Sequence, residues 1–254
     1  MSAAAFFDLD RTLIAGSSAM EFVRACRRAG LVRRRDLARW GIEHLRFRLR
    51  GSTDQSTEKA LSAAEQMLHG VPERTLARMA PELLAGILPR IYPAMLVEVH
   101  SHQDQGRSTF IVSAAGDEIV RLLATVLGMD GGIGSRYAVD GEGNLTGRLD
   151  GPLMYGEGKV EAVKRFADQH GLDLAESWGY SDSASDLPML RAVGHAVVVN
   201  PDSELAAIAA AEGWGVMRFE RLGRNLAVGA AVVAMGIAGL VGHLLHPRIR
   251  AAIR

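Results

Sequence analysis

Residues 3–13 read AAAFFDLDRTL, a short apolar run that is closed by two carboxylates. The apolar run is too short for a helix and is typical of a fully buried strand, so it predicts a strand over 3–7. Asp8 and Asp10 follow this strand directly. Because parallel α/β sheets bind ligands at the carboxyl ends of their strands, the two acids mark the first candidate functional position.

The rest of the chain alternates between strand and helix patterns. Further apolar runs predict strands over 108–112, 177–181, 196–199 and 215–217. Helical patterns between and after these runs cover 117–127, 159–169 and 204–211. Strands that alternate with helices predict an α/β fold with a parallel sheet covered on both faces.

The interval after the first strand is too long for a single crossover helix. It holds no strand pattern, but it holds helical stretches at 19–29, 36–49, 56–68, 74–84 and one that follows Pro93. We therefore predict a helical cap over 17–94, inserted into a core formed by 1–16 and 95–222, and a C-terminal segment over 223–254. An alternating pattern over 137–149 predicts a β-hairpin around Asp140-Gly141.

The composition is that of a folded globular protein. The chain has 254 residues, of which 48% are hydrophobic, and its 29 basic and 29 acidic side chains give a formal net charge of zero. Such a balance gives no indication of a nucleic-acid partner. The only cysteine is Cys26, which excludes an intrachain disulfide and any zinc or iron–sulfur site with several cysteine ligands.

The predicted ends of strands and helices bring polar side chains to one edge of the sheet. They are Asp8, Asp10, Ser113, Lys159, Asp182 and Asp186. Carboxylates that lie close together repel one another, so such a cluster needs a cation. Carboxylate oxygens combined with a substrate phosphate suit Mg²⁺, and we predict that ion as the cofactor.

These segments carry a resemblance to a known family. Residues 8–13 (DLDRTL) resemble the first motif of the haloacid dehalogenase (HAD) superfamily, Val112-Ser113 resembles its second, and Gly158-Lys159 its third. The fourth motif is matched by residues 179–190 (GYSDSASDLPML). The sub-branch that the chain resembles contains the phosphoserine phosphatases. It implies a Rossmann-like core with an all-helical cap after the first motif, and hydrolysis of a phosphate ester.

The resemblance also implies a role for each motif residue. Asp8 would be the nucleophile that forms an aspartyl-phosphate, and Asp10 would protonate the leaving oxygen and then activate water. The implied Mg²⁺ ligands are the Asp8 carboxylate, the Asp10 carbonyl and Asp182. The implied phosphate-binding residues are Thr12, Ser113, Ala114 and Lys159, with Thr12 also orienting the loop around Asp8. Asp186 and Ser185 would support this arrangement from outside.

Three positions depart from the phosphoserine phosphatase pattern. That family carries a cap glutamate for the substrate amino group, where this chain has Ser17-Ser18 and its nearest carboxylate is Glu21. Ala114 replaces a usual glycine, and Ser185 replaces a frequent asparagine. The expected substrate is therefore a small phosphorylated metabolite of unspecified identity. Alternatives are phosphotransfer to an alcohol, hydrolysis of a phospholipid head group, and a phosphate-binding scaffold without activity.

Two segments bear on the surroundings of the protein. Residues 24–50 contain ten arginines and two acids, which would attract an anionic substrate or an anionic membrane surface. Residues 226–245 contain one polar side chain, His243, and are long enough to span a membrane as a helix. The N-terminus shows no secretory signal. We therefore expect a cytoplasmic protein, with anchoring to the inner face of the membrane as the alternative, and leave the oligomeric state open.

Overall fold

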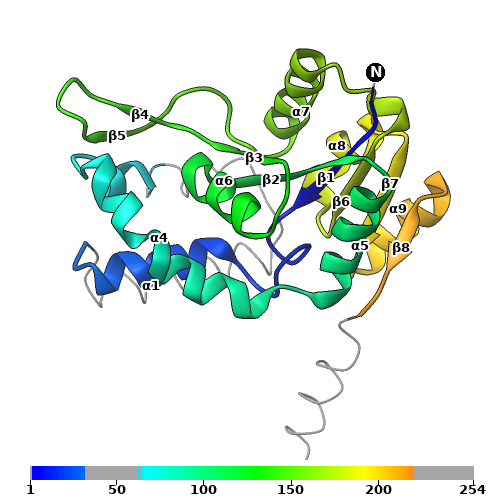
Figure 1. Cartoon of the computed structure of the whole chain (residues 1–254), viewed down its shortest axis with the longest axis horizontal. Coiled ribbons are helices and arrows are strands. Elements are labelled where there is room, and N and C mark those ends of the chain that lie inside the picture. Colours follow the sequence, from blue (N-terminus) through cyan, green and yellow to red (C-terminus); the bar gives the residue numbers. More distant parts are fainter. Residues whose placement is uncertain (1, 32–61, 63, 220–254) are drawn as a thin grey trace, which may run out of the picture. The chain divides into compact units, whose positions relative to one another are not determined.

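The computed structural model describes residues 2–31, 62 and 64–219, and everything below refers to these residues (Figure 1). The predicted cap helix at 36–49, most of that at 56–68, and the apolar segment 226–245 lie outside the described residues. Within the part described, no helix is long and apolar enough to cross a membrane.

A parallel sheet confirms the predicted α/β class. Its strands in the described chain follow the spatial order β3-β2-β1-β6-β7-β8, and every neighbouring pair is parallel. The strands are β1 (Ala4–Asp8), β2 (Ser108–Gly116), β3 (Gly131–Ser135), β6 (Trp178–Ser181), β7 (His195–Val199) and β8 (Gly215–Met217). All except β3 correspond to predicted strands.

The unpredicted strand β3 is rich in glycine, and its neighbours explain why. A Cβ atom on Gly134 would lie 2.5 Å from the Cα of Asp117, and one on Gly132 would lie 2.7 Å from Val120. Both contacts belong to helix α6 (Asp117–Val126), which packs directly on β3. The glycines that allow this approach also remove the branched side chains by which a strand is recognised.

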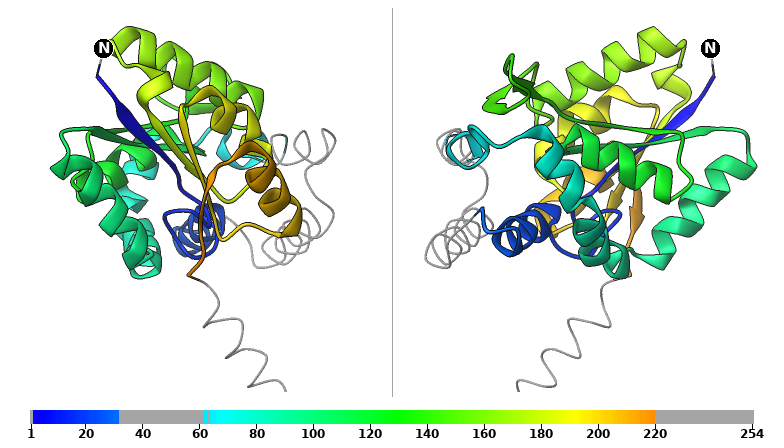
Figure 2. Two further views of the ribbon diagram at one scale, coloured as in Figure 1. Left: turned by 90° about the vertical axis from the view of Figure 1, so that its right-hand side faces the viewer. Right: turned by 60° about the vertical axis from the view of Figure 1, so that its left-hand side comes forward.

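Helices cover both faces of the sheet, as Figure 2 shows from two sides. They are α5 (Pro93–Asp104), α6, α7 (Glu157–His170), α8 (Leu187–Ala192) and α9 (Ser203–Glu212), with short 3-10 turns at Leu88–Arg90, Leu174–Glu176 and Ala184–Asp186. One face forms a core in which Phe6 and Phe110 pack with Val163 of α7 and Leu190 of α8. Side chains of a strand alternate between faces, so Phe7 points to the other face.

That second face carries a chain of hydrogen bonds beneath α5. Phe7 and Tyr180 stack with ring centroids 4.5 Å apart, and the Nε2 of His102 lies 2.8 Å from the Tyr180 hydroxyl. Arg107 donates from Nε to His102 Nδ1 over 2.7 Å. Because Arg107 can only donate, His102 is neutral, carries its proton on Nε2 and donates to Tyr180, which donates to Glu98.

The described cap helices are α1 (Ser18–Arg28) and α4 (Glu73–Ile87), which pack together around Cys26 and Met79. Two chain crossings between core and cap run side by side, since Ala15 donates to the carbonyl of Arg90 over 2.7 Å and Tyr92 to that of Leu13 over 2.9 Å. Helix α5 begins at Pro93 and packs on β1 and β2, so the whole helix belongs to the core.

A hairpin from the core also contacts the cap. Strands β4 (Tyr137–Val139) and β5 (Leu145–Leu149) are antiparallel, as predicted, and their turn extends over 140–144, where Asp140 accepts from the backbone of Glu142 and Asn144. Gly70 donates to the carbonyl of Leu145, and Leu145 donates to that of Val71, each over 2.8 Å. The cap is therefore held to the core at the crossings and at the hairpin.

Buried His102 should make the fold sensitive to acid. Burial lowers the pKa of His102 from 6.5 to about 4, and the Arg107 charge adds to this effect. Between those values the unfolded chain binds a proton that the folded chain does not, so the stability that is present above pH 6.5 is lost as pH falls toward 4. We expect the free energy of unfolding, measured with urea, to fall more steeply over this window in the natural chain than in His102→Gln. Exposed His100→Gln is the matched control on α5; equal slopes in all three would contradict the prediction.

Candidate active site

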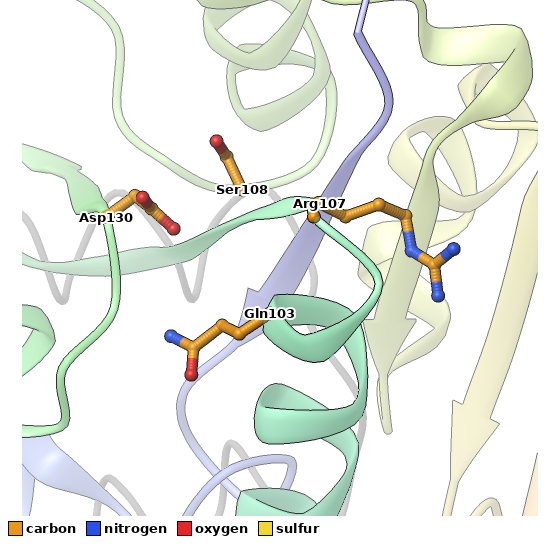
Figure 3. A pocket seen from close by; sticks show the side chains of 5 residues that line it. Gln103, Arg107, Ser108 and Asp130 are labelled. Atoms are coloured by element: carbon orange, nitrogen blue, oxygen red, sulfur yellow. The ribbon is translucent and has the colours of Figure 1, made fainter.

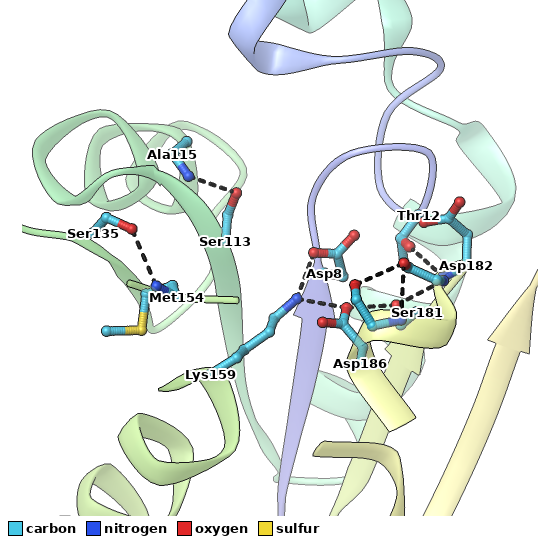
Figure 4. A network of polar contacts seen from close by, with 12 residues as sticks. Asp8, Thr12, Ser113, Ala115, Ser135, Met154, Lys159, Ser181, Asp182 and Asp186 are labelled. Atoms are coloured by element: carbon cyan, nitrogen blue, oxygen red, sulfur yellow. Dashed lines mark hydrogen bonds and ion pairs between the residues drawn. The ribbon is translucent and has the colours of Figure 1, made fainter. Parts of the chain in front are cut away.

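Three strand ends bring the predicted residues together. The register pairs Asp8 with Val112 of β2, so Ser113 lies one residue beyond it at the same edge. On the other side of β1, strand β6 ends at Ser181 and leads into Asp182. Figure 4 shows these side chains converging at the carboxyl edge of the sheet, where the parallel topology predicts a binding site.

Lys159 occupies the centre of the cluster. Its Nζ donates to Asp8 Oδ1 over 2.6 Å and to Asp186 Oδ2 over 2.7 Å, and the lysine is 2% exposed. Ser181 Oγ donates to the same Asp186 oxygen over 2.6 Å. Gly158 precedes Lys159 because a Cβ there would lie 2.3 Å from the carbonyl oxygen of Leu153. The glycine lets the first turn of α7 approach Leu153 closely, and this places the ammonium between Asp8 and Asp186.

The net effect of burial and the neighbouring charges is to raise the pKa values of Asp8, Lys159 and Asp182. Burial raises the pKa of the Asp8 carboxyl, Lys159 opposes this, and Asp186 and Asp182 reinforce it by repulsion. Burial lowers the pKa of Lys159, but attraction to Asp186 and Asp8 outweighs burial and leaves it raised. Burial also raises the pKa of Asp182 to about 6, against the attraction of Arg11. The site therefore gathers three carboxyl groups, of Asp8, Asp182 and Asp186, around one buried ammonium.

Asp182 is fixed by the loop that follows β1. Its backbone N–H donates to Thr12 Oγ1 over 3.0 Å, and Arg11 Nη1 lies 3.1 Å from its Oδ2. Thr12 is fully buried, so its hydroxyl connects the loop to the end of β6. Arg11 and Ser181 had no predicted role, although Arg11 is a charge within the first motif and Ser181 is a hydroxyl within the fourth.

Asp10 contacts the cap. Its Oδ1 accepts from the backbone N–H of Ser18 over 2.8 Å, and its Oδ2 accepts from Ser17 Oγ over 3.1 Å. These contacts lie at the first turn of α1, whose unpaired N–H groups favour a negative charge. The acid predicted for proton transfer is therefore also the residue that joins the loop after β1 to the first cap helix.

The remaining predicted residues surround this centre. Ser113 is buried and its Oγ accepts from the backbone of Ala115 over 3.2 Å, whereas Ala114 is exposed. The Ser185 hydroxyl lies 2.8 Å from that of Ser183, just before Asp186. Ser185 thus supports the loop between β6 and α8.

Glu21 of the cap is buried and already paired. Arg24 Nη1 bonds to its Oε1, and Arg90 Nη2 lies 3.1 Å from the same oxygen. A Cβ on Gly86 would lie 2.7 Å from the other carboxylate oxygen, so α4 closes over it. Glu21 could be identified from the sequence, but Arg90 could not, because it is distant in the chain and reaches Glu21 only where the two crossings lie together.

The donor set fits a hard cation. In the described chain, no three His, Cys, Asp or Glu side chains are arranged to hold a metal by themselves. The carboxylates of Asp8 and Asp182 lie at this edge instead, and the Asp10 carbonyl stays a predicted ligand. Mg²⁺ usually takes one or two carboxylates, with water and substrate phosphate completing its shell. The three acidic side chains gathered around one ammonium also favour a second cation.

A hollow of about 380 Å³ lies at the opposite, amino end of β2 (Figure 3). It is lined by Gln103, Gly106, Arg107, Ser108 and Asp130. Gln103 donates to the carbonyl of Gly128 over 2.7 Å, and Asp130 accepts from the backbone of Thr109 over 2.7 Å. These bonds hold the end of α5 and the start of β2 against the loop between α6 and β3, at the edge of the sheet opposite to the carboxylate cluster.

Comparisons with known proteins agree with this geometry. A family model described as haloacid dehalogenase-like hydrolase matches residues 5–191. The phosphoserine phosphatase SerB1 of Mycobacterium tuberculosis is 32% identical over 94% of this chain and 78% of its own length. A histidinol-phosphatase of Neisseria meningitidis is 31% identical over 85% of this chain and 98% of its own. A substrate-bound phosphoserine phosphatase structure shares the fold, with a TM-score of 0.62 and 19% identity over 90% of this chain and 98% of that one.

Replacing Lys159 with methionine should destabilise the fold. The change would leave the carboxylates of Asp8 and Asp186 buried without their shared cation, at a cost of about 3–5 kcal/mol. Urea denaturation of Lys159→Met measures this loss, and Lys164→Met, at an exposed position of the same helix, is the control. A variant as stable as the control would show that the ammonium is not needed to bury the carboxylates.

Proposed function

Because the chain belongs to the haloacid dehalogenase-like hydrolase family, we propose that it is a Mg²⁺-dependent phosphatase that hydrolyses a small phosphorylated metabolite through an aspartyl-phosphate. Relatives more than 30% identical are named phosphatases, which supports the reaction class. The observation that carries the proposal is the buried Lys159 between Asp8 and Asp186, with Asp182 beside them.

In this proposal Asp8 is the nucleophile. A carboxylate oxygen of Asp8 forms a bond to phosphorus while the bond from phosphorus to the ester oxygen breaks. Lys159 holds Asp8 in place and offsets its negative charge as the anionic phosphate approaches. Water then attacks the phosphorus of the aspartyl-phosphate and releases inorganic phosphate, which restores Asp8.

Asp10 would transfer the protons of both steps. It donates a proton to the leaving alcohol oxygen and afterwards takes one from the attacking water. Its two contacts with Ser17 and Ser18 make this residue sensitive to where the cap lies. Proton transfer to the leaving group and the placement of the first cap helix are therefore linked through one carboxylate.

The other residues would neutralise and position the phosphate. Ser113, the backbone after it at Ala114, and Lys159 would hold the phosphoryl oxygens. The carboxylates of Asp8 and Asp182 and the Asp10 carbonyl would hold Mg²⁺, which supplies positive charge to the transferring phosphoryl group. Asp186 and Ser185 would keep Lys159 and the loop before it in place.

A phosphate-release screen with Mg²⁺ tests the proposed reaction. We expect turnover on at least one soluble phosphomonoester, and a loss of about 10³-fold or more in Asp8→Asn, because that change removes the nucleophile. Asp168→Asn, exposed on α7, is the control. No release from any ester by the folded, metal-loaded chain would contradict the proposal.

Two further arms of the screen test the alternative functions, phosphotransfer to an alcohol and hydrolysis of a phospholipid head group. Added alcohols reveal phosphotransfer if the phosphate leaves as a new ester rather than as inorganic phosphate. Lysophosphatidate in vesicles reveals action on a lipid head group if it is hydrolysed faster than the soluble esters. Inorganic phosphate formed from soluble esters alone would favour the metabolite.

Glu21 bears on the substrate class. Its carboxylate is held by two guanidinium groups, so we do not expect it to receive a substrate ammonium group. Phosphoserine and 3-phosphoglycerate differ by an amino group in place of a hydroxyl, and a buried ion pair to the amine would favour phosphoserine by well over tenfold. We expect their kcat/KM values to lie within about tenfold of each other. A much larger preference for phosphoserine would show that a carboxylate binds the substrate ammonium group.

A further inference from the structure

Arg11 lies between two motif residues, Asp10 and Thr12, and contacts a third. Its Nη1 is 3.1 Å from Asp182 Oδ2, and the two side chains are 45% and 4% exposed, respectively. A half-exposed cation thus covers a carboxylate that is otherwise enclosed. The guanidinium lies on the same carboxylate that the proposed function assigns to Mg²⁺.

The backbone of Arg11 is unusual. Within the described residues, only Arg11 (φ 61°) and Asn200 (φ 44°) have positive φ without being glycine. For an L-residue this left-handed conformation costs about 1–2 kcal/mol, whereas glycine adopts it without that cost. A side chain kept at such a position needs a compensating contact, and the contact seen is the one with Asp182.

The neighbouring residues fix the direction of this contact. Thr12 is fully buried and accepts from the Asp182 backbone, and Leu13 and Ile14 both donate to the carbonyl of Leu9 over 3.0 Å. The turn is therefore anchored on both sides of Arg11. With the backbone held, the long side chain is the part of the turn that can leave Asp182 without disturbing the loop.

We propose that Arg11 is a positioning residue that takes the place of the metal at Asp182 while the site holds none, and that it releases the carboxylate when Mg²⁺ binds. The inference rests on the proposed function. Arg11 holds Asp182 in place at the edge of the cluster through this ion pair. Its partial exposure gives the guanidinium a path to solvent once it leaves.

Competition between the two cations has a measurable consequence. In the natural chain, Mg²⁺ binding at Asp182 must break the Arg11 ion pair and place a divalent cation near a guanidinium. Without the Arg11 charge there is no ion pair to break and no guanidinium to repel the divalent cation. The variant should therefore bind Mg²⁺ more tightly and should be less stable only when the metal is absent.

Calorimetric titration with Mg²⁺ alone tests the inference without substrate. We expect Arg11→Gln to lower the Kd for Mg²⁺ by about tenfold, and Arg11→Lys, which keeps the charge, to stay near the natural value. Arg11→Gly is the second variant, since glycine tolerates the positive φ and also lacks the cation. Arg191→Gln, half-exposed and paired with Glu212 on the core surface, is the matched control and should leave the Kd unchanged.

Melting temperatures in EDTA and in saturating Mg²⁺ provide a second readout. We expect Arg11→Gln to melt below the natural chain in EDTA and level with it in Mg²⁺. An equal loss of melting temperature in EDTA and in Mg²⁺ would overturn the inference and leave the proposed function standing. So would a Kd for Mg²⁺ that is unchanged or higher in both Arg11→Gln and Arg11→Gly. Absence of Mg²⁺ binding by the natural chain would overturn the metal requirement itself, and this inference with it.

Discussion

The buried ammonium of Lys159 is the interaction on which the rest of the structure depends. It lies within 2.7 Å of two carboxylates that come from β1 and from the loop after β6, and it reaches them from the first turn of a helix. Three separate elements are thereby drawn to one point. Without a cation there, the acidic side chains of Asp8 and Asp186 would be buried side by side with no charge to offset their repulsion.

The sequence predicts the elements around this point well, because each ends in a residue type that has no structural reason to be there. Asp8, Ser113 and Asp182 follow short apolar runs, and those runs form β1, the first part of β2 and β6, although β2 continues past Ser113 to Gly116. Strand β3 could not be found in the same way. Its glycines make room for α6, and they lack the side chains by which a strand is recognised. The apolar pattern of a segment predicts which of its residues are buried, but it does not predict which element packs against them.

Contacts between distant segments were the other gap. That Asp10 binds the start of α1 and that Arg90 pairs with Glu21 depends on two chain crossings lying together, which no spacing in the sequence expresses. Arg11 was visible in the first motif, yet its left-handed backbone and its contact with Asp182 appear only in three dimensions. Residue types identified the chemistry, whereas their partners in space decide how that chemistry is linked to the cap.

The hairpin meets the cap through main-chain hydrogen bonds between Gly70, Val71 and Leu145 and through a buried apolar cluster of Leu68, Val71 and Leu145. The main-chain bonds form whatever side chains the two partners carry, whereas the apolar cluster restricts the residues that pack in it. Gly147 is restricted as well, because a Cβ there would lie 2.4 Å from the carbonyl of Glu65. Such a protein can vary the cap residues outside this junction while the apolar cluster and one glycine keep the cap joined to the core.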